Sequence, residues 1–352
     1  EKLLEQKELS KNEILNILET TTDRLFPVNS KIKKVDFYIQ TIDIKNLEDI
    51  INQNESRKIH VYGDAGVGKT STLSSLKTIF PNNLTIIYDS FGAGTYKNVG
   101  EKRHFKKSIL TQLINEIAVN TGLSLHIDKE MDLNDLEFEF KQQLQNASRL
   151  LNDKKIFIII DAADNNVEAA NYFQEDPFIK ELWNIQLPNN VYLIMSSRDG
   201  LRKESLCASS DVKDLKLYGF DEISSGLFLS KSYPNINEEI SKKFHDRTKG
   251  NPRLQSYIIE KSNNDENQLK DILNRKENIS LEHIFEDMWN SAISIIQPIT
   301  RNHVEELICL SRPATLDDYI LASNISKDNA LKVIDTFSGI VLNENNCIGF
   351  LV

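Results

Sequence analysis

The chain has 352 residues, a formal net charge of −10 at pH 7 and a hydrophobic fraction of 40%. This length favours more than one domain, and the apolar content is sufficient for packed cores. The acidic balance disfavours broad electrostatic attraction to DNA or RNA. The sequence contains no signal peptide and no apolar run of about eighteen residues, so we expect a cytoplasmic protein without a membrane partner.

The spacing of the three cysteines also indicates a cytoplasmic protein. Cys207, Cys309 and Cys347 have neither CxxC nor any other metal-binding spacing. We therefore expect reduced thiols in a cytosolic protein, buried as small apolar side chains.

We expect the chain to be a piece of a longer protein, with residues missing at one or both ends. The first residue is Glu1 rather than Met, and the last residues, 347–352, form an apolar run that is typical of a strand. In residues 1–25, Leu and Ile recur at helical spacing among Glu and Lys. This pattern predicts a packed helix, with a linker or a partner-binding helix as alternatives. A second helix is expected over 46–52, before the first strand.

A strand, a glycine-rich turn and a helix start follow one another from residue 59. The apolar run at 59–62 precedes GDAGVGKT at 63–70. Glycines let backbone N–H groups fold around phosphate oxygens, and the helix N-terminus adds a favourable dipole. Lys69 is expected to reach the β- and γ-phosphates, and the Thr70 hydroxyl to ligate Mg²⁺. A chance match is disfavoured by the flanking strand and helix, so the sequence predicts a nucleoside triphosphate site.

The next segments predict further layers of an α/β sheet. A helix from about residue 70 ends before Pro81, and a second strand covers 84–88. The loop at 89–96 contains Gly92 and Gly94 at the carboxyl edge of this strand, where ligands of such sheets bind. An ordinary turn is the preferred interpretation, and a loop near the nucleotide is the alternative. Amphipathic and polar helices are expected over 105–117 and 132–151.

A second decisive stretch is the apolar run that ends in Asp161. Five consecutive apolar residues at 156–160 predict a strand that is buried on both faces, with its carboxylate at the rim. Asp161 is placed to hold the Mg²⁺ hydration shell, the Walker B role. Asp164 could orient or activate water, or could cap a helix.

Another strand ends next to a candidate sensor of phosphate. A helix containing residues 178–185 precedes a strand at 191–195, which leads into Ser196, Ser197 and Arg198. The guanidinium of Arg198 is suited to read phosphate charge, whereas a surface pair with Asp199 is the alternative. Residues 215–220 predict a short fifth strand, and every connection is long enough for a right-handed parallel crossover.

The remaining residues predict two smaller modules. Residues 221 to about 275 look helical, and Gly250-Asn251-Pro252 marks a helix end, a turn and a new helix. Three short helices at 301–311, 315–322 and 326–337, followed by a hairpin, are typical of a winged helix. Only Lys327 and Lys332 lie on its third helix, so we favour a packing role over DNA binding.

These elements predict an α/β P-loop NTPase with a five-stranded parallel sheet in ASCE-type order, followed by helical and winged-helix domains. The expected boundaries are 1–45 for an N-terminal helical linker or remnant, 46–220 for the nucleotide-binding domain, 221–280 for the helical domain and 281–352 for the winged helix.

The motif set resembles the STAND class of P-loop ATPases, which includes NACHT and plant-type resistance proteins. The stretches are GDAGVGKT at 63–70, IIIDAAD at 158–164, MSSR at 195–198 and GNP at 250–252. YDSFGAGTYKN at 88–98, followed by Arg103 and His104, and LSRPATLDDYILAS at 310–323 are similar to the ATPase core of the bacterial antiviral STAND (Avs) proteins. The likeness covers roughly residues 45 to 352.

The resemblance implies an ATP/ADP-dependent switch in antiviral defence. In such proteins a C-terminal sensor recognises a viral (phage) protein, ATP replaces ADP, and self-association into a homo-oligomer activates an N-terminal effector. It implies ATP/ADP and Mg²⁺ as ligands and ATP hydrolysis, which the departure from the family pattern at Asn165 predicts to be slow. The acidic balance and the absence of a basic recognition helix disfavour a nucleic-acid role for the core.

Site residues follow from the same likeness, position by position. Lys69, Asp161, Asp164 and Arg198 would be catalytic, and Thr70 and Asp161 would hold the metal. Asn165 stands where an acid often follows the second Asp, which leaves the identity of the catalytic base open. His303 is the nearest counterpart of the family's phosphate-contacting histidine, although a surface histidine is the preferred interpretation. The residues assigned to nucleotide binding are Gly63, Asp64, Ala65, Gly66, Val67, Gly68, Lys69, Thr70, Ser71 and Pro252.

Two other functions compete. An origin-recognition-like or other AAA-type ATPase would bind DNA through the winged helix and could use Arg253 as a second sensor arginine. A nucleotide-bound scaffold would not hydrolyse ATP at all.

Overall fold

The computed structural model describes residues 15–28, 30, 32, 39–90, 103–127, 132–206, 208–274, 280, 286, 290, 298–309, 314–336, 341–344 and 347–350. The predicted helix over 1–25 falls mostly outside these residues, and its described part includes a short helix, α2 (Thr22–Leu25). No helix within the described ranges is long and apolar enough to cross a membrane.

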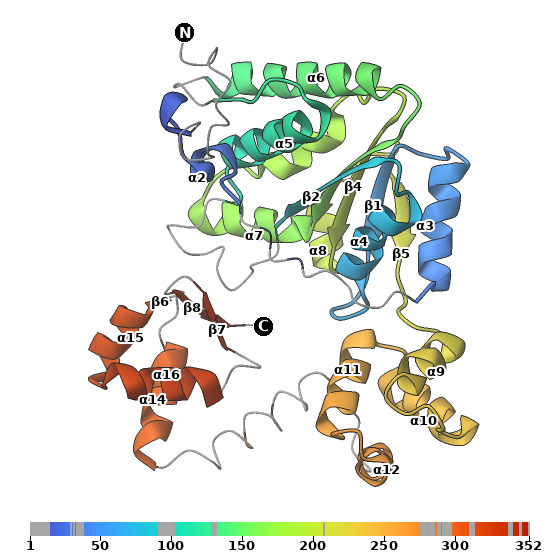
Figure 1. The fold of residues 1–352 in the computed structure, drawn as a ribbon, viewed down its shortest axis with the longest axis vertical. Coiled ribbons are helices and arrows are strands. Elements are labelled where there is room, and N and C mark those ends of the chain that lie inside the picture. Colours follow the sequence, from blue (N-terminus) through green and yellow to red (C-terminus); the bar gives the residue numbers. More distant parts are fainter. Residues whose placement is uncertain are drawn as a thin grey trace, which may run out of the picture.

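A parallel sheet of five strands forms the centre of the larger part of the chain (Figure 1). Its strands are β1 (Lys58–Tyr62), β2 (Leu84–Asp89), β3 (Ile156–Asp161), β4 (Val191–Ser197) and β5 (Lys213–Lys216). Their order is β2-β3-β4-β1-β5, with parallel pairing throughout. β4 thus separates β1 from β3, which confirms the predicted ASCE-type order of a P-loop NTPase fold. Every residue of β3 and β4 is buried, as their apolar runs predict.

Helices cover both faces of the sheet (Figure 1). They are α3 (Ile42–Asn52), α4 (Lys69–Ile79), α5 (Lys106–Thr121), α6 (Leu133–Leu150), α7 (Ala163–Phe173), the 3₁₀ helix η1 (Phe178–Asn184) and α8 (Leu201–Ser205). Apolar residues of α3 and α4 pack on one face of β1, β3 and β4. Residues of α5, α6 and η1, including Trp183, pack on the other. The sheet and the helices on its two faces form three layers, and the carboxyl ends of the parallel strands lie at one edge of the sheet.

Three predicted elements differ from the structure. α3 begins at Ile42 rather than at residue 46, because Thr41 caps it by accepting a hydrogen bond from the Ile44 N–H. The fifth strand covers Lys213–Lys216 rather than 215–220, since the backbone N–H groups of Tyr218 and Gly219 donate to a side chain instead of a strand. The helix predicted around 178–185 is the 3₁₀ helix η1, and α7 before it was missed.

A helical module follows the sheet. It consists of α9 (Glu222–Ser230), α10 (Glu238–Thr248), α11 (Pro252–Lys261) and α12 (Glu266–Asn274). Leu229, Phe244, Ile258 and Leu269 are buried in its own core. α11 begins with Pro252, and the Asn251 side chain caps it by accepting from the N–H groups of Arg253 and Leu254. The predicted turn between two helices is therefore present at this point.

A last group of elements has its own small core. These are α14 (Pro298–Cys309), β6 (Ala314–Thr315), α15 (Leu316–Ser323), α16 (Lys327–Thr336), β7 (Val341–Glu344) and β8 (Cys347–Phe350), with sheet order β6-β8-β7. Leu316, Tyr319 and Val333 are among its buried residues. The helices and hairpin lie close to the predicted ranges; the designation as a winged helix and the domain boundaries stay predictions. Cys309 is exposed, so the expectation that it is buried was wrong.

Candidate nucleotide site

The loop between β1 and α4 has a backbone that requires glycine at two positions. Gly66 has φ +81° and Gly68 has φ +98°, a region that side chains with a Cβ rarely adopt. A Cβ on Gly66 would lie 2.8 Å from the Asn251 Oδ1 atom. α4 begins at Lys69, directly after the second of these glycines. The loop therefore presents backbone N–H groups at a helix N-terminus, which suits phosphate.

Lys69 holds the shape of this loop. Its Nζ atom donates to the Gly63 carbonyl oxygen at 2.8 Å and to the Asp64 carbonyl oxygen at 2.9 Å. Burial lowers the pKa of Lys69, and the nearby carboxylates of Asp164 and Asp161 oppose that change. An ammonium group has three donors, so one remains to reach a phosphate oxygen after two loop contacts.

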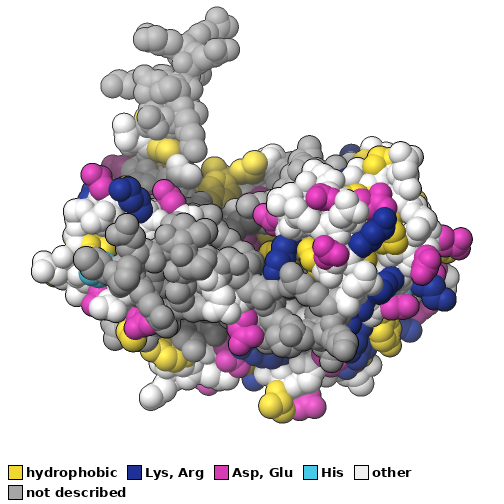
Figure 2. Space-filling model, turned by 90° about the horizontal axis from the view of Figure 1, so that it is seen from below, with side chains coloured by type: hydrophobic (Ala, Val, Ile, Leu, Met, Phe, Trp, Pro, Cys, Tyr) yellow, Lys and Arg dark blue, Asp and Glu magenta, His cyan; other side chains and the backbone are white. Residues whose placement is uncertain are grey.

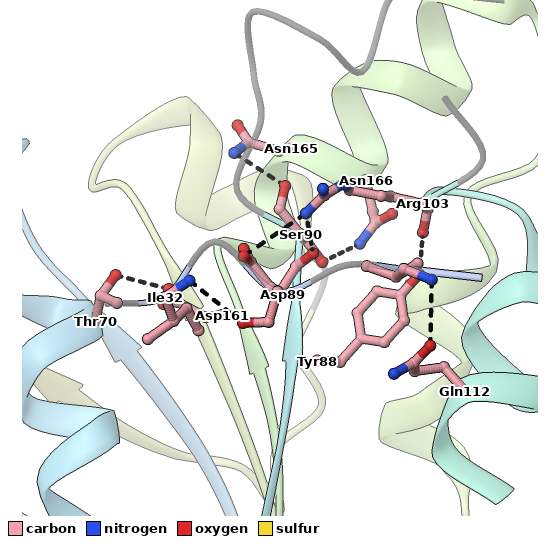
Figure 3. Close-up of polar contacts among 12 residues, drawn as sticks. Ile32, Thr70, Tyr88, Asp89, Ser90, Arg103, Gln112, Asp161, Asn165 and Asn166 are labelled. Atoms are coloured by element: carbon pink, nitrogen blue, oxygen red, sulfur yellow. Dashed lines mark hydrogen bonds and ion pairs between the residues drawn. The ribbon is translucent and has the colours of Figure 1, made fainter. Parts of the chain in front are cut away.

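Asp161, at the end of β3, accepts hydrogen bonds from two hydroxyl groups, of which Figure 3 labels that of Thr70. Thr70 Oγ1 donates to Asp161 Oδ2, and Ser196 Oγ donates to Asp161 Oδ1, each at 2.6 Å. Burial raises the pKa of Asp161, and the two hydroxyl hydrogen bonds counteract that rise. The hydroxyl of Thr70 and the carboxylate of Asp161 are the hard oxygen ligands that Mg²⁺ prefers.

These residues fit a Mg²⁺ ion that is shared with phosphate. The described residues contain no group of three or more His, Cys, Asp or Glu that could hold a metal alone. Mg²⁺ commonly uses one or two protein ligands and completes its shell with phosphate oxygens and water. Thr70 and Asp161 would hold the ion, which would neutralise phosphate charge when bound.

Asp164 lies in the first turn of α7 rather than at its cap. The N-cap is Ala162, which has φ +54°, so the alternative that Asp164 caps the helix was wrong. The backbone N–H of Arg198 donates to the Asp164 carboxylate, and Arg202 Nη1 lies 3.6 Å from Asp164 Oδ2. Burial raises the pKa of Asp164, and Arg202 opposes the rise. Arg202 was not anticipated, because α8, on which it lies, was not predicted.

Arg198 stands beside this group at the end of β4. The alternative pairing with Asp199 was wrong, since Asp199 binds Lys216 at 2.6 Å. The charge of Arg198 contributes to the lowered pKa of Lys69, whose main cause is burial. Beneath them, His60 Nε2 on β1 lies 2.8 Å from Ser197 Oγ, and that hydroxyl donates to the Arg198 carbonyl oxygen. Burial lowers the pKa of His60 to about 4.

A buried polar network adjoins Asp161 (Figure 3). Asp89 ends β2 opposite Asp161, and the Arg103 Nη1 atom lies 3.6 Å from its Oδ2 atom. Asn166 donates to the Ser90 hydroxyl and Asn165 to the Ser90 carbonyl oxygen. Asp89 could have been found from the sequence, because β2 and β3 are neighbouring strands that both end in Asp. Gly92 and Gly94 of the predicted loop lie outside the described residues.

The first turn of α11 contacts the phosphate loop directly. Asn251 Nδ2 donates to the Ala65 carbonyl oxygen at 2.9 Å, and the Arg253 backbone N–H donates to the Gly66 carbonyl oxygen at 3.3 Å. Figure 1 shows α11 next to the end of the sheet where α4 begins. Pro252 was predicted at the site, whereas the GNP motif at 250–252 does not by itself indicate a role for Asn251. The helical module therefore binds the loop that would hold phosphate.

A cavity of about 220 Å³ lies beside this contact. Val67, Phe220, Phe228 and Pro252 supply apolar walls, and Gly68, Ser71 and Thr72 connect it to the start of α4. An apolar slot next to a phosphate cradle suits the base of a nucleotide. His303, by contrast, pairs with Glu306 on α14 at 3.0 Å.

Comparison with known proteins finds only distantly similar structures, so the candidate site is argued from its own geometry. No family model and no curated protein matches the chain. Solved structures that are similar to it include a STAND protein with a tetratricopeptide repeat sensor from Pyrococcus horikoshii, with 16% identity, a TM-score of 0.49 and 92% of this chain covered. The chain spans 43% of that protein's length.

Two further solved structures share a similarly low sequence identity with the chain. A Walker-type ATPase of Pyrococcus abyssi shares 14% identity, with a TM-score of 0.49, over 93% of this chain and 97% of its own. The ORC1 protein of Aeropyrum pernix in complex with DNA shares 13% identity, with a TM-score of 0.40, over 93% and 92%. Likeness at this distance does not assign an activity to the chain.

Proposed function

We propose that this chain is the ATP/ADP-dependent switch core of a STAND-class protein that hydrolyses ATP slowly. Gly63–Thr70 backbone groups and Lys69 would hold the phosphates, and Thr70 and Asp161 would hold Mg²⁺. The observation that carries the proposal is the direct bonding of Asn251 and Arg253 to the phosphate loop. Phosphate that displaces or tightens this contact would move the helical module.

Slow hydrolysis is expected because Asn165 stands where an acid often follows the second Asp, which leaves Asp164 as the candidate that orients water. A water molecule that attacks the γ-phosphorus needs a group to orient it, and Asp164 is a candidate whose charge acts on Lys69. Its carboxylate already receives the Arg198 N–H and faces Arg202. The two arginines would stabilise phosphate charge, and their contacts only partly offset the rise in the pKa of Asp164 that burial causes.

The biological setting rests on the motif resemblance. YDSFGAGTYKN at 88–98 and LSRPATLDDYILAS at 310–323 favour a role in antiviral (anti-phage) defence. In such a role, a C-terminal sensor for a viral protein controls an N-terminal effector through self-association. Neither the sensor nor the effector belongs to the residues described, so they remain part of the proposal.

Two measurements on the purified chain test the switch. Single-turnover hydrolysis of Mg·ATP is expected to be slow, with Asp161→Asn slower still. Sedimentation velocity is expected to give different species with ADP and with a non-hydrolysable ATP analogue. Rapid multiple turnover, or identical sedimentation in both nucleotides, would contradict the proposed switch.

The competing DNA-binding function is less well supported. The chain carries a net charge of −10, and Lys and Arg side chains lie among Asp and Glu side chains on the face drawn in Figure 2. The guanidinium of Arg253 lies over the Tyr257 ring rather than at Lys69. Duplex binding at physiological ionic strength with a steep salt dependence would reverse this ranking.

A further inference from the structure

Asp43 is a buried acid that borders the cavity next to the phosphate loop. It lies in the first turn of α3 and is 3% exposed. Its Oδ2 atom accepts hydrogen bonds from the backbone N–H groups of Tyr218 at 2.9 Å and Gly219 at 3.1 Å. This atom therefore fixes the connection between β5 and the helical module.

The second carboxylate oxygen has no such role. Asp43 Oδ1 is buried and has no hydrogen-bond partner among the described residues. A buried acceptor without a partner costs free energy, so native structures seldom retain one without a reason. None of the described residues that line the cavity is a Lys or Arg. An ionised carboxylate can only accept, so the missing partner must be a donor.

We propose that Asp43 Oδ1 accepts a hydrogen bond from the exocyclic amino group of adenine and thereby selects adenine nucleotides. This inference rests on the proposed function, because it places the base of the bound nucleotide in the cavity. Val67, Phe220 and Pro252 supply apolar surfaces for the faces of the ring. Gly68 and Ser71, which also line the cavity, connect it to the phosphate cradle.

The choice between bases follows from donor and acceptor positions. Adenine carries an amino donor at its 6-position, whereas hypoxanthine and guanine carry a carbonyl oxygen there. A carbonyl oxygen that faces Asp43 Oδ1 would bring two acceptors together without a proton between them. A site built around one polar contact of this kind discriminates strongly against the analogue that lacks the donor.

Mg·ATP and Mg·ITP are the probes that test the inference, by isothermal titration calorimetry. The wild-type chain is expected to bind ATP about tenfold or more tighter than ITP. In Asp43→Asn, the amide oxygen can keep the two backbone N–H bonds, so the NH₂ group replaces Oδ1 and offers a donor. The ratio of ATP to ITP affinity is therefore expected to fall below that of the wild type and to approach or pass unity.

Asp221→Asn is the matched control. Asp221 caps α9 and its charge acts on Asp43, but it does not line the cavity. This variant is expected to keep the wild-type ratio. If the wild-type chain binds ATP and ITP equally tightly, the role of Asp43 is refuted, whereas the phosphate site is not. This comparison needs only the wild-type chain, so it holds even where Asp43→Asn does not fold. A folded Asp43→Asn that keeps the wild-type ratio of ATP to ITP affinity would also refute the role of Asp43. A wild-type chain that binds neither nucleotide would refute the proposed function as well.

Discussion

Replacing Asn251 by Asp separates the two roles of this side chain. Its Oδ1 atom caps α11, and Asp caps a helix about as well as Asn. Its Nδ2 atom holds the Ala65 carbonyl oxygen of the phosphate loop at 2.9 Å, and Asp has no donor for that contact. The lost hydrogen bond is worth about 1 kcal/mol, and a screened carboxylate beside the phosphates adds a repulsion of about the same size. A total of about 2 kcal/mol corresponds to roughly thirtyfold weaker ATP binding.

Calorimetric titration with Mg·ATP, together with thermal unfolding, measures both roles. Asn251→Asp is expected to weaken ATP binding with little change in the unfolding temperature of the free chain. Asn237→Asp is the control, because Asn237 caps α10 through the Ile240 N–H and does not line the cavity. ATP affinity within about twofold of wild type in Asn251→Asp, or an equal loss in Asn237→Asp, would refute the coupling between module and loop.

Three further predictions concern the surroundings of the site. Ser196→Ala leaves the buried Oδ1 of Asp161 without its hydroxyl, so we expect a loss of about 1–3 kcal/mol in the free energy of unfolding, measured in urea, and slower Mg²⁺-dependent hydrolysis. Burial lowers the pKa of His60 from 6.5 to about 4, so the unfolded chain takes up the proton first as the pH falls. The free energy of unfolding should therefore decrease by about 3 kcal/mol between about pH 6.5 and about pH 4, and urea titrations of His60→Gln should lack that part of the decrease. Gly66→Ala should weaken ATP binding in calorimetry far more than Gly122→Ala, because both have positive φ but only a Cβ at Gly66 meets other atoms within 4 Å; equal effects would contradict this.

The phosphate loop and Asp161 could be predicted from sequence because their signals are local. The spacing of Gly63, Gly68 and Lys69 specifies a backbone path within eight residues, and the apolar run before Asp161 specifies a strand buried on both faces. The sheet order then follows from the P-loop fold, and the structure confirms it.

The missed features depend on contacts between distant segments. Asp43 ends the fifth strand early from 175 positions away, and Asn251 reaches Ala65 across 186 positions. Neither residue has neighbours in the sequence that indicate its partner. Arg202 was missed for a related reason, since the five-residue α8 is too short for a recognisable helical period.

Equilibrium binding of Mg·ATP to the wild-type chain and to Lys69→Ala tests the central claim most directly. The account predicts one site per chain and an affinity that falls by more than about tenfold in Lys69→Ala, because charge-assisted hydrogen bonds to phosphate are worth about 1.5–3 kcal/mol each. Lys77→Ala, at an exposed position on the same helix, should bind like the wild type. An unchanged ATP affinity in Lys69→Ala would contradict the assignment of the loop as the phosphate site.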